Sequence, residues 1–83
     1  MHTVYLFGSD YASPLALHQA LKRLLDLPDY YGFNADALND CLDEMQPSLR
    51  LIVLDPGEGD TAAALRLVAR VFRDNGLFVR EVE

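Results

Sequence analysis

The sequence contains little of what crosslinks and metal sites require. Among its 83 residues there is one cysteine, Cys41, so a disulfide within the chain is excluded. Its two histidines, His2 and His18, have no ligand neighbour at the spacing that zinc sites use. We therefore expect no metal site and no cofactor. Cys41 falls on the apolar side of a predicted helix, which indicates a small buried hydrophobe rather than a reactive thiol.

Basic residues and long apolar runs are also scarce. Seven lysines and arginines stand against thirteen acidic residues, which gives a formal charge of −6. Such a chain should repel nucleic acid and attract a basic partner by long-range steering, although acidity can also serve solubility alone. No apolar run approaches the about 20 residues of a membrane helix, and the N-terminus lacks the pattern of a signal peptide. We expect a cytoplasmic protein without membrane contact.

What the sequence does contain is an alternation of strand and helix patterns. Its 51% hydrophobic residues predict one folded domain over residues 1–83 with a modest core. The patterns follow the order β-α-α-β-α-β, and connections through helices imply parallel pairing. We predict an α/β fold with a three-stranded parallel sheet and packed helices. The predicted strands are 3–7, 49–54 and 77–82, and the predicted helices are 13–26, 34–46 and 60–75.

The first and last strands differ in pattern. Residues 3–7 form a continuous run of β-branched and aromatic residues that ends at Gly8. Such a run is typical of a central strand in a parallel sheet, covered on both faces. Residues 77–82 alternate more clearly and are interrupted by Arg80 and Glu81. This pattern predicts an edge strand with one face partly in solvent.

Each predicted helix has a cap and one apolar stripe. The expected N-caps are Ser13, Asn34, and either Asp60 or Thr61. His18 falls mostly on the polar side of the first helix. The apolar stripes are expected to face the core. They comprise Leu17, Ala20, Leu21, Leu24 and Leu25 in the first helix, Leu38, Cys41, Leu42 and Met45 in the second, and Leu65, Leu67, Val68, Ala69, Val71 and Phe72 in the third.

The second helix carries a row of acidic residues that costs stability. Asp36 and Asp40 are four residues apart, and Asp43 and Glu44 follow at the next turn. Like charges at this spacing destabilise an isolated helix by about 0.2–0.5 kcal/mol per pair. The residues alone leave two interpretations open. One is a binding surface maintained at the expense of stability, and the other is a solvated face paired with Arg66, Arg70 and Arg73 of the third helix.

Two segments together resemble the barstar family of intracellular ribonuclease inhibitors. They are residues 17–23, Leu-His-Gln-Ala-Leu-Lys-Arg, and residues 27–42, which contain the pattern Leu-Pro-acid-Tyr-Tyr-Gly-x-Asn-x-Asp-Ala-Leu. Residues 71–74, Val-Phe-Arg-Asp, add a later match. The resemblance implies a protein without enzymatic activity that blocks the active site of a basic ribonuclease, barnase-like or other. It implies that the second helix and the loop before it make the contact.

The resemblance also assigns roles to residues. It implies partner contacts by Tyr30, Asp36, Asp40 and Asp74, and a loop shaped by Gly32 and Asn34. Asn39 lies among these contact positions, where the family's namesake has a tryptophan. Asp74 stands where the namesake has a longer glutamate.

The chemistry of a ribonuclease site fits these residue types. A carboxylate on a rigid helix can occupy the position of an RNA phosphate and accept charge-assisted hydrogen bonds from Arg, Lys or His. We expect Asp40 to take this role beside Asp36, and Tyr30 to add a flat contact with one hydroxyl. Tyr31 is expected in the core.

Two other functions stay open at this point. The same fold could bind a different basic partner, which the change at Asn39 permits. Alternatively, Asp10 and Asp55 could hold Mg²⁺ at the carboxyl ends of two parallel strands.

Overall fold

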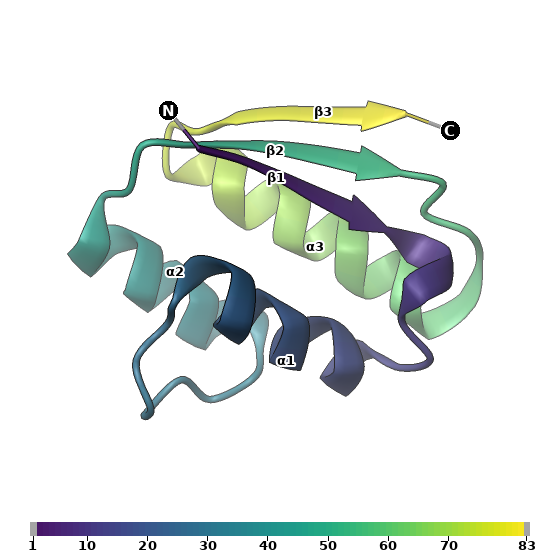
Figure 1. The fold of residues 1–83 in the computed structure, drawn as a ribbon, viewed down its shortest axis with the longest axis horizontal. Helices are drawn as coiled ribbons and strands as arrows, with labels where there is room; N and C mark the ends of the chain where they lie inside the picture. Colours follow the sequence, from purple (N-terminus) through teal and green to yellow (C-terminus); the bar gives the residue numbers. More distant parts are fainter. Residues whose placement is uncertain (1, 83) are drawn as a thin grey trace.

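The computed structural model describes residues 2–82, and in this range it has the predicted element order (Figure 1). A short 3-10 helix, η1, replaces the start of the loop expected after the first strand. Strand β3 begins one residue later than predicted. The elements are β1 (His2–Phe7), η1 (Gly8–Asp10), α1 (Pro14–Leu25), α2 (Ala35–Met45), β2 (Leu49–Leu54), α3 (Gly59–Asp74) and β3 (Phe78–Val82).

The three strands form one parallel sheet in the order β1-β2-β3, which confirms the α/β class and the parallel pairing. The prediction that residues 3–7 form a central strand is wrong, because β2 lies in the centre and β1 lies at an edge. The helices lie on one side of the sheet, with α3 next to the strands (Figure 1). Burial alternates along β1 accordingly, with Val4 and Leu6 buried and Tyr5 and Phe7 exposed.

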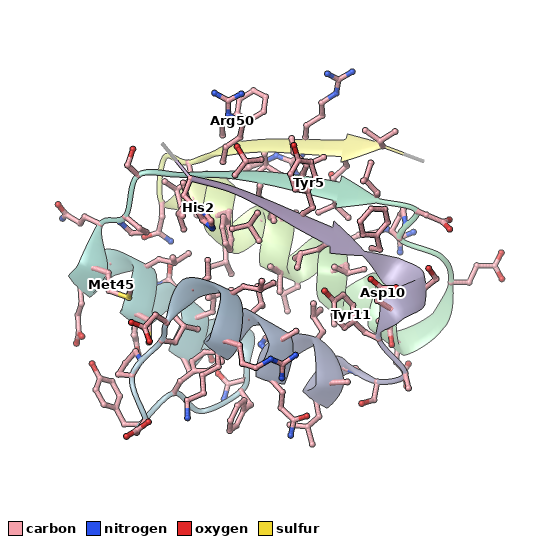
Figure 2. All side chains as sticks on the ribbon, viewed as in Figure 1. His2, Tyr5, Asp10, Tyr11, Met45 and Arg50 are labelled. Atoms are coloured by element: carbon pink, nitrogen blue, oxygen red, sulfur yellow. The ribbon has the colours of Figure 1, made fainter. Side chains whose placement is uncertain are left out.

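The hydrophobic core lies between the sheet and the helices. Strand residues such as Leu51 and Val53 join a buried cluster with Leu17, Leu38 and Phe72 of the three helices. Three residues expected in the inward stripes are instead substantially exposed. They are Leu24, Met45 and Leu67, which lie at the borders of their stripes, and Met45 at the last position of α2 is 42% exposed (Figure 2).

Two of the three predicted helix caps are confirmed. The Oγ of Ser13 accepts a hydrogen bond from the backbone N–H of Ala16, and the Oδ1 of Asn34 accepts one from Ala37. The third is wrong, since α3 begins at Gly59 with Glu58 as its N-cap and no side-chain cap bond. Gly59, the first residue of α3, has a φ of 85°, which lies outside the right-handed helical region and which glycine adopts at little cost.

His18 is buried, which corrects its predicted position on the polar side of α1. Its side chain is 6% exposed, and its Nδ1 is hydrogen-bonded to the hydroxyl of Tyr31, whose ring lies in the core as predicted. Burial lowers the pKa of His18 and raises the pKa of Tyr31. Both shifts mean that the folded protein holds this pair in its uncharged form.

The buried His18 should make stability depend on pH. Its folded pKa lies below the ordinary value near 6.5, so the unfolded chain binds the proton more tightly. The free energy of unfolding should be constant above about pH 6.5 and fall as the pH drops through that value toward the folded pKa, with a slope of at most about 1.4 kcal/mol per pH unit. Urea denaturation between about pH 7.5 and 5.5 measures this.

Two variants isolate the effect. His18→Gln keeps a polar side chain beside Tyr31 but cannot titrate, so it should flatten the pH dependence. His2→Gln removes the exposed histidine of β1 and should retain the dependence of the wild type. An unchanged slope in His18→Gln would assign the pH dependence to other groups.

Candidate functional site

The loop between α1 and α2 turns one tyrosine inward and the other outward. Tyr31 is buried, whereas Tyr30 is 70% exposed and donates a 2.7 Å hydrogen bond from its hydroxyl to Oε2 of Glu44. This bond raises the pKa of Tyr30 and keeps its hydroxyl protonated. The aromatic ring of Tyr30 is therefore held at the surface against the last turns of α2.

Asn34 connects this loop to the start of α2. Besides capping the helix through Oδ1, it donates from Nδ2 to the carbonyl oxygen of Gly32 at 3.1 Å. The positive φ of this loop lies at Phe33, with a value of 54°, and not at Gly32. The Phe33 ring lies edge-on to Tyr31 at 5.4 Å between centroids, which helps to hold this conformation.

The exposed side of α2 presents a row of carboxylates, the acidic face, which comprises Asp36, Asp40, Asp43 and Glu44. All four side chains are exposed, and Leu38, Cys41 and Leu42 anchor the opposite side of the helix in the core. Burial raises the pKa of Cys41, which keeps it a neutral thiol as expected. Asp36 lies in the first turn, where the helix dipole favours an anion.

The arginines of α3 do not neutralise the acidic face. Arg70 lies 4.0 Å from Asp74 of its own helix, and Arg73 pairs with Glu81 of β3 at 3.0 Å. Between residues 2 and 82, the ion pairs include none that joins a carboxylate of α2 to an arginine of α3. The interpretation of a face paired with these arginines is therefore wrong.

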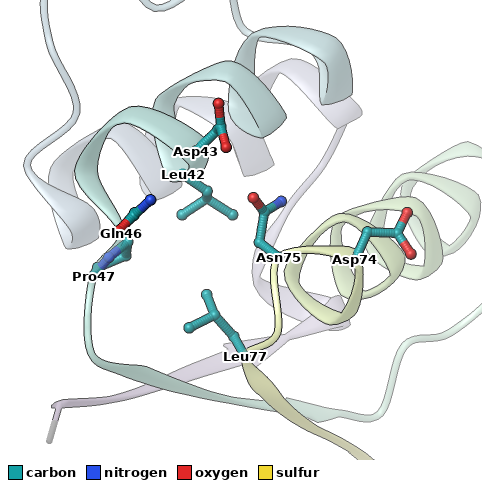
Figure 3. Close-up of a pocket in the computed structure, with 7 residues that line it drawn as sticks. All are labelled: Leu42, Asp43, Gln46, Pro47, Asp74, Asn75 and Leu77. Carbon is teal, nitrogen blue, oxygen red and sulfur yellow. The ribbon is translucent and has the colours of Figure 1, made fainter.

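A groove of about 400 Å³ lies beside the acidic face, between the end of α2 and the end of α3 (Figure 3). Asp43 lines the groove from α2 and Asp74 lines it from α3, where the Asp74 carboxylate points away along the helix and lies 4.0 Å from Arg70. Asp43 and Gln46 were missed as candidate site residues. In the sequence, the only indication that Asp43 belongs to the site was its position three residues after Asp40. The lining residues are Leu42, Asp43, Gln46, Pro47, Asp74, Asn75 and Leu77.

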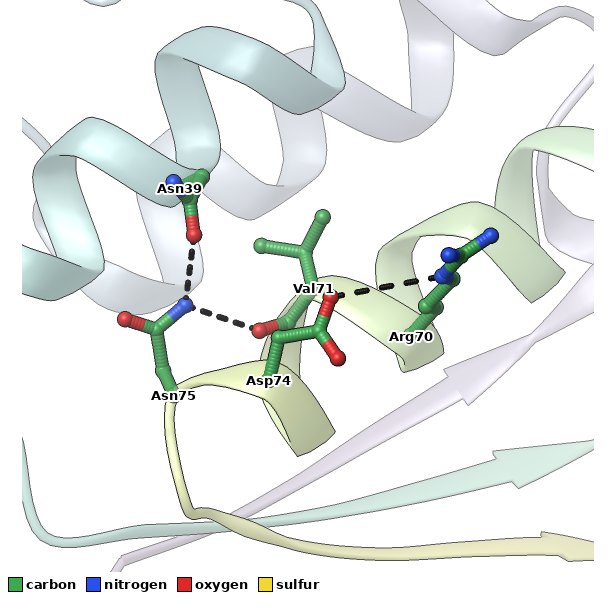
Figure 4. Close-up of polar contacts among 5 residues, drawn as sticks. All are labelled: Asn39, Arg70, Val71, Asp74 and Asn75. Atoms are coloured by element: carbon green, nitrogen blue, oxygen red, sulfur yellow. Dashed lines mark hydrogen bonds and ion pairs between the residues drawn. The ribbon is translucent and has the colours of Figure 1, made fainter.

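Asn39 is tied to the end of α3 (Figure 4). Its Oδ1 accepts a 2.8 Å hydrogen bond from Nδ2 of Asn75, which also donates to the carbonyl oxygen of Val71 at 2.8 Å. The bond fixes α2 relative to α3 and brings Asn39 close to the residue that precedes Asn75, Asp74. Sequence analysis placed Asn39 and Asp74 in one surface but gave no sign of the Asn75 connection.

The structure thus brings the candidate residues to one side of the molecule. The Tyr30 hydroxyl bonds to Glu44 at the end of the acidic face, and Asn39 and Asp74 lie at the junction of α2 with α3. Asp10 and Asp55 of the magnesium alternative follow β1 and β2, and residues 2–82 contain no group of three side chains that could hold a metal ion. No helix in that range is long and apolar enough to cross a membrane.

Comparisons with known proteins agree with this arrangement. The family model described as Barstar (barnase inhibitor) matches residues 1–80. The chain is also 50% identical over 42 residues to the Bacillus subtilis (strain 168) protein named "Putative ribonuclease inhibitor YrdF". That match covers 51% of this chain and 46% of the relative, so it spans about half the length of each. Because the family model covers nearly the whole sequence, the chain belongs to the barstar family.

Proposed function

We propose that this protein inhibits a ribonuclease by placing the acidic face of α2 and the ring of Tyr30 in the active site. Family membership and the name of the relative support ribonuclease inhibition in general, by a protein without catalytic activity of its own. The observation that carries the finer proposal is the row of exposed carboxylates on α2 without an ion-pair partner from α3.

Electrostatics support this mode of inhibition. A ribonuclease active site holds cationic and hydrogen-bonding groups that bind RNA phosphate, and carboxylates at fixed positions can accept the same bonds. Asp40 lies at the middle of α2, so its backbone is held on both sides by helical turns. We assign Asp40 the position of a phosphate, with Asp36 beside it and Asp74 at the edge.

Tyr30 has the properties of an aromatic contact residue. Its hydrogen bond to Glu44 restricts the ring before the partner arrives, which lowers the entropy cost of binding. The formal charge of −6 would steer a basic partner toward the protein and accelerate association at low salt. The partner is therefore proposed to be a basic ribonuclease, and the cytoplasmic location stays a prediction.

An inhibition assay tests the proposal. Cleavage of a fluorescent RNA is measured with barnase and with a panel of other small basic ribonucleases, at increasing concentrations of this protein. We expect equimolar protein to inhibit at least one enzyme and to bind it more slowly as salt rises. Full activity of every enzyme at a large excess of the protein would argue for a partner that is not a ribonuclease.

Asn39 provides a test of which ribonuclease is preferred. Its hydrogen bond to Asn75 keeps a small polar group where the family's namesake presents a tryptophan. Asn39→Trp would replace that bond with an exposed aromatic surface, which is typical of strong interface contacts. We expect this variant to inhibit barnase about tenfold better or more, and the cognate enzyme less well. Asn39→Ala removes the hydrogen bond to Asn75 without adding a ring, so its inhibition constants show how much of the change in Asn39→Trp comes from the lost bond.

A further inference from the structure

Within residues 2–82, one face of the sheet has no layer of helices over it. The helices lie on the other side, and the strand register places every second residue of each strand on the open side (Figure 1). All-parallel sheets are normally covered on both faces, so this one is incomplete by comparison. We call this surface the open sheet face. It consists of three rows across the strands, Thr3-Arg50-Phe78, Tyr5-Ile52-Arg80 and Phe7-Leu54-Val82.

Most of the open sheet face is hydrophobic. Six of its nine side chains are aromatic or aliphatic, and they include Tyr5 at 56% exposed, Phe78 at 55% and Phe7 at 43%. Tyr5 points away from the helices (Figure 2). The largest apolar patch of a monomer is often functional. Because Tyr5 and Phe7 lie on this face, the sequence of β1 has the pattern of a strand that is covered on both faces. The chain itself covers only one of them.

The charged side chains on this face are positive, whereas the net charge of the protein is negative. Arg50 and Arg80 stand in adjacent rows, and the guanidinium of Arg50 lies 5.6 Å from the centroid of the Phe78 ring. The three rows contain no acidic side chain, although the whole chain has a formal charge of −6. A complementary surface would combine apolar side chains with carboxylates.

The size of the face indicates the kind of partner. Three strands about 4.8 Å apart and five residues long at about 3.3 Å each give roughly 15 by 17 Å, or about 250 Å². A contact of this size is that of a weak, transient interface. Two copies of this face would bring arginines together, which disfavours a dimer. One α-helix, about 10 Å wide and about 11 residues long over that distance, fits the area.

We propose that the open sheet face binds an amphipathic helix of a partner protein, with an apolar stripe over Tyr5, Ile52 and Phe7 and with Asp or Glu side chains that pair with Arg50 and Arg80. The bound helix would supply the missing layer of the α/β fold. Helix α2 lies on the helix side of the sheet, away from the open sheet face, so the protein could hold this partner and a ribonuclease at the same time (Figure 1).

Synthetic peptides test the proposal with the wild-type protein. One helical peptide of about 15 residues carries a leucine stripe flanked by glutamates, and a matched peptide replaces each glutamate with lysine. Binding is followed by fluorescence anisotropy, and amide shifts in NMR spectra locate it. We expect the acidic peptide to bind about tenfold more tightly or better than the basic one and to shift the amides of β1, β2 and β3. Equal affinities, or shifts confined to α2, would overturn the proposal.

Charge reversal provides the matched control. The double variant Arg50→Glu/Arg80→Glu should bind the acidic peptide with an affinity lower by about tenfold or more, and should bind the basic peptide more tightly than the wild type does. Arg23→Glu/Arg66→Glu makes the same change on the exposed sides of α1 and α3 and should bind as the wild type does. Neither pair touches the acidic face, so ribonuclease inhibition should persist in both and report on the other site separately.

Two further measurements exclude other occupants. A single-stranded oligouridine should not compete, because the acidic chain repels nucleic acid, although aromatic sheet faces can stack bases. Sedimentation of the protein alone should show a monomer at the concentrations of the binding assay. Oligouridine binding that is tighter than peptide binding, or a dimer lost in the Arg50→Glu/Arg80→Glu variant, would replace the proposed helix with RNA or with a second copy.

Discussion

Replacing Asp40 with alanine should weaken inhibition of the target ribonuclease by roughly two to three orders of magnitude while the protein stays folded. Asp40 is exposed and makes no ion pair within residues 2–82, so its loss removes nothing from the core. In the complex it would face cationic groups that bind phosphate. Truncating one member of a desolvated charge pair typically costs about 2–5 kcal/mol, partly because the other charge stays buried and unpaired.

The controls separate a local contact from the general loss of negative charge. Glu58→Ala removes one negative charge at the N-terminus of α3, where Glu58 makes no side-chain cap bond, at the opposite end of the molecule from α2 (Figure 1). It should change the inhibition constant by less than about threefold. Asp40→Asn keeps the shape of the side chain and should lose most of the inhibition, because the charge is what binds. Equal inhibition by Asp40→Ala and Glu58→Ala would remove Asp40 from the proposed site.

The elements of the fold could be predicted because their signals are local. The 3.6-residue period of the apolar stripes and the capping residues Ser13 and Asn34 determine α1 and α2 within a residue or two. The signal of Pro28, a residue that cannot continue a helix and that follows α1, and the signals of the short strands between helices are equally local. Connections through helices then imply parallel strands by topology alone, and the register confirms this.

The position of a strand in the sheet was not predictable in the same way. The apolar run in β1 shows that Tyr5 and Phe7 could be covered, but whether another layer exists depends on segments far away in the sequence. His18 is similar, since its burial depends on Tyr31, thirteen residues later, which supplies a hydrogen bond that compensates for the loss of water. The polarity of the histidine side chain was the reason that His18 was predicted at the surface.

The candidate site also contains residues that a local sequence pattern could predict and contacts that it could not. Tyr30, Asp36 and Asp40 lie in one continuous segment, so a sequence motif was enough to select them. The contact between Asn39 and Asn75 spans thirty-six residues, and it could be found only once α2 and α3 were placed side by side. The groove between Asp43 and Asp74 has the same origin, because its two walls come from different helices.

Gly8→Ala should be among the most destabilising single changes in the chain. Gly8 is buried at the end of β1, where a β-carbon would lie within 2.6 Å of the carbonyl carbon of Pro56 and closer still to the carbonyl oxygens of Asp55 and Pro56. Ordinary contacts between carbon atoms are about 3.5–4.0 Å. All three are backbone atoms, which cannot rotate away as a side chain could.

The strain from Gly8→Ala would pass into the sheet. The N–H of Asp55 donates a 3.0 Å hydrogen bond to the carbonyl oxygen of Val82, so a shift of residues 55–56 disturbs the pairing of β2 with β3. We expect the free energy of unfolding to fall by about 3 kcal/mol or more, which is a large part of the about 5–15 kcal/mol of a typical domain. Urea denaturation followed by circular dichroism measures this.

Gly57→Ala is the matched control for this collision. Its φ of 75° favours glycine, but within residues 2–82 no atom beyond its chain neighbours lies within 4 Å of where the new β-carbon would be. It should therefore cost only the about 1–2 kcal/mol of a left-handed alanine. Gly8 has no positive φ, so its loss reports the close approach of β1 to the end of β2 alone, and it should exceed the loss at Gly57. Equal or smaller losses in Gly8→Ala would mean that residues 55–56 can move apart from Gly8 at little cost.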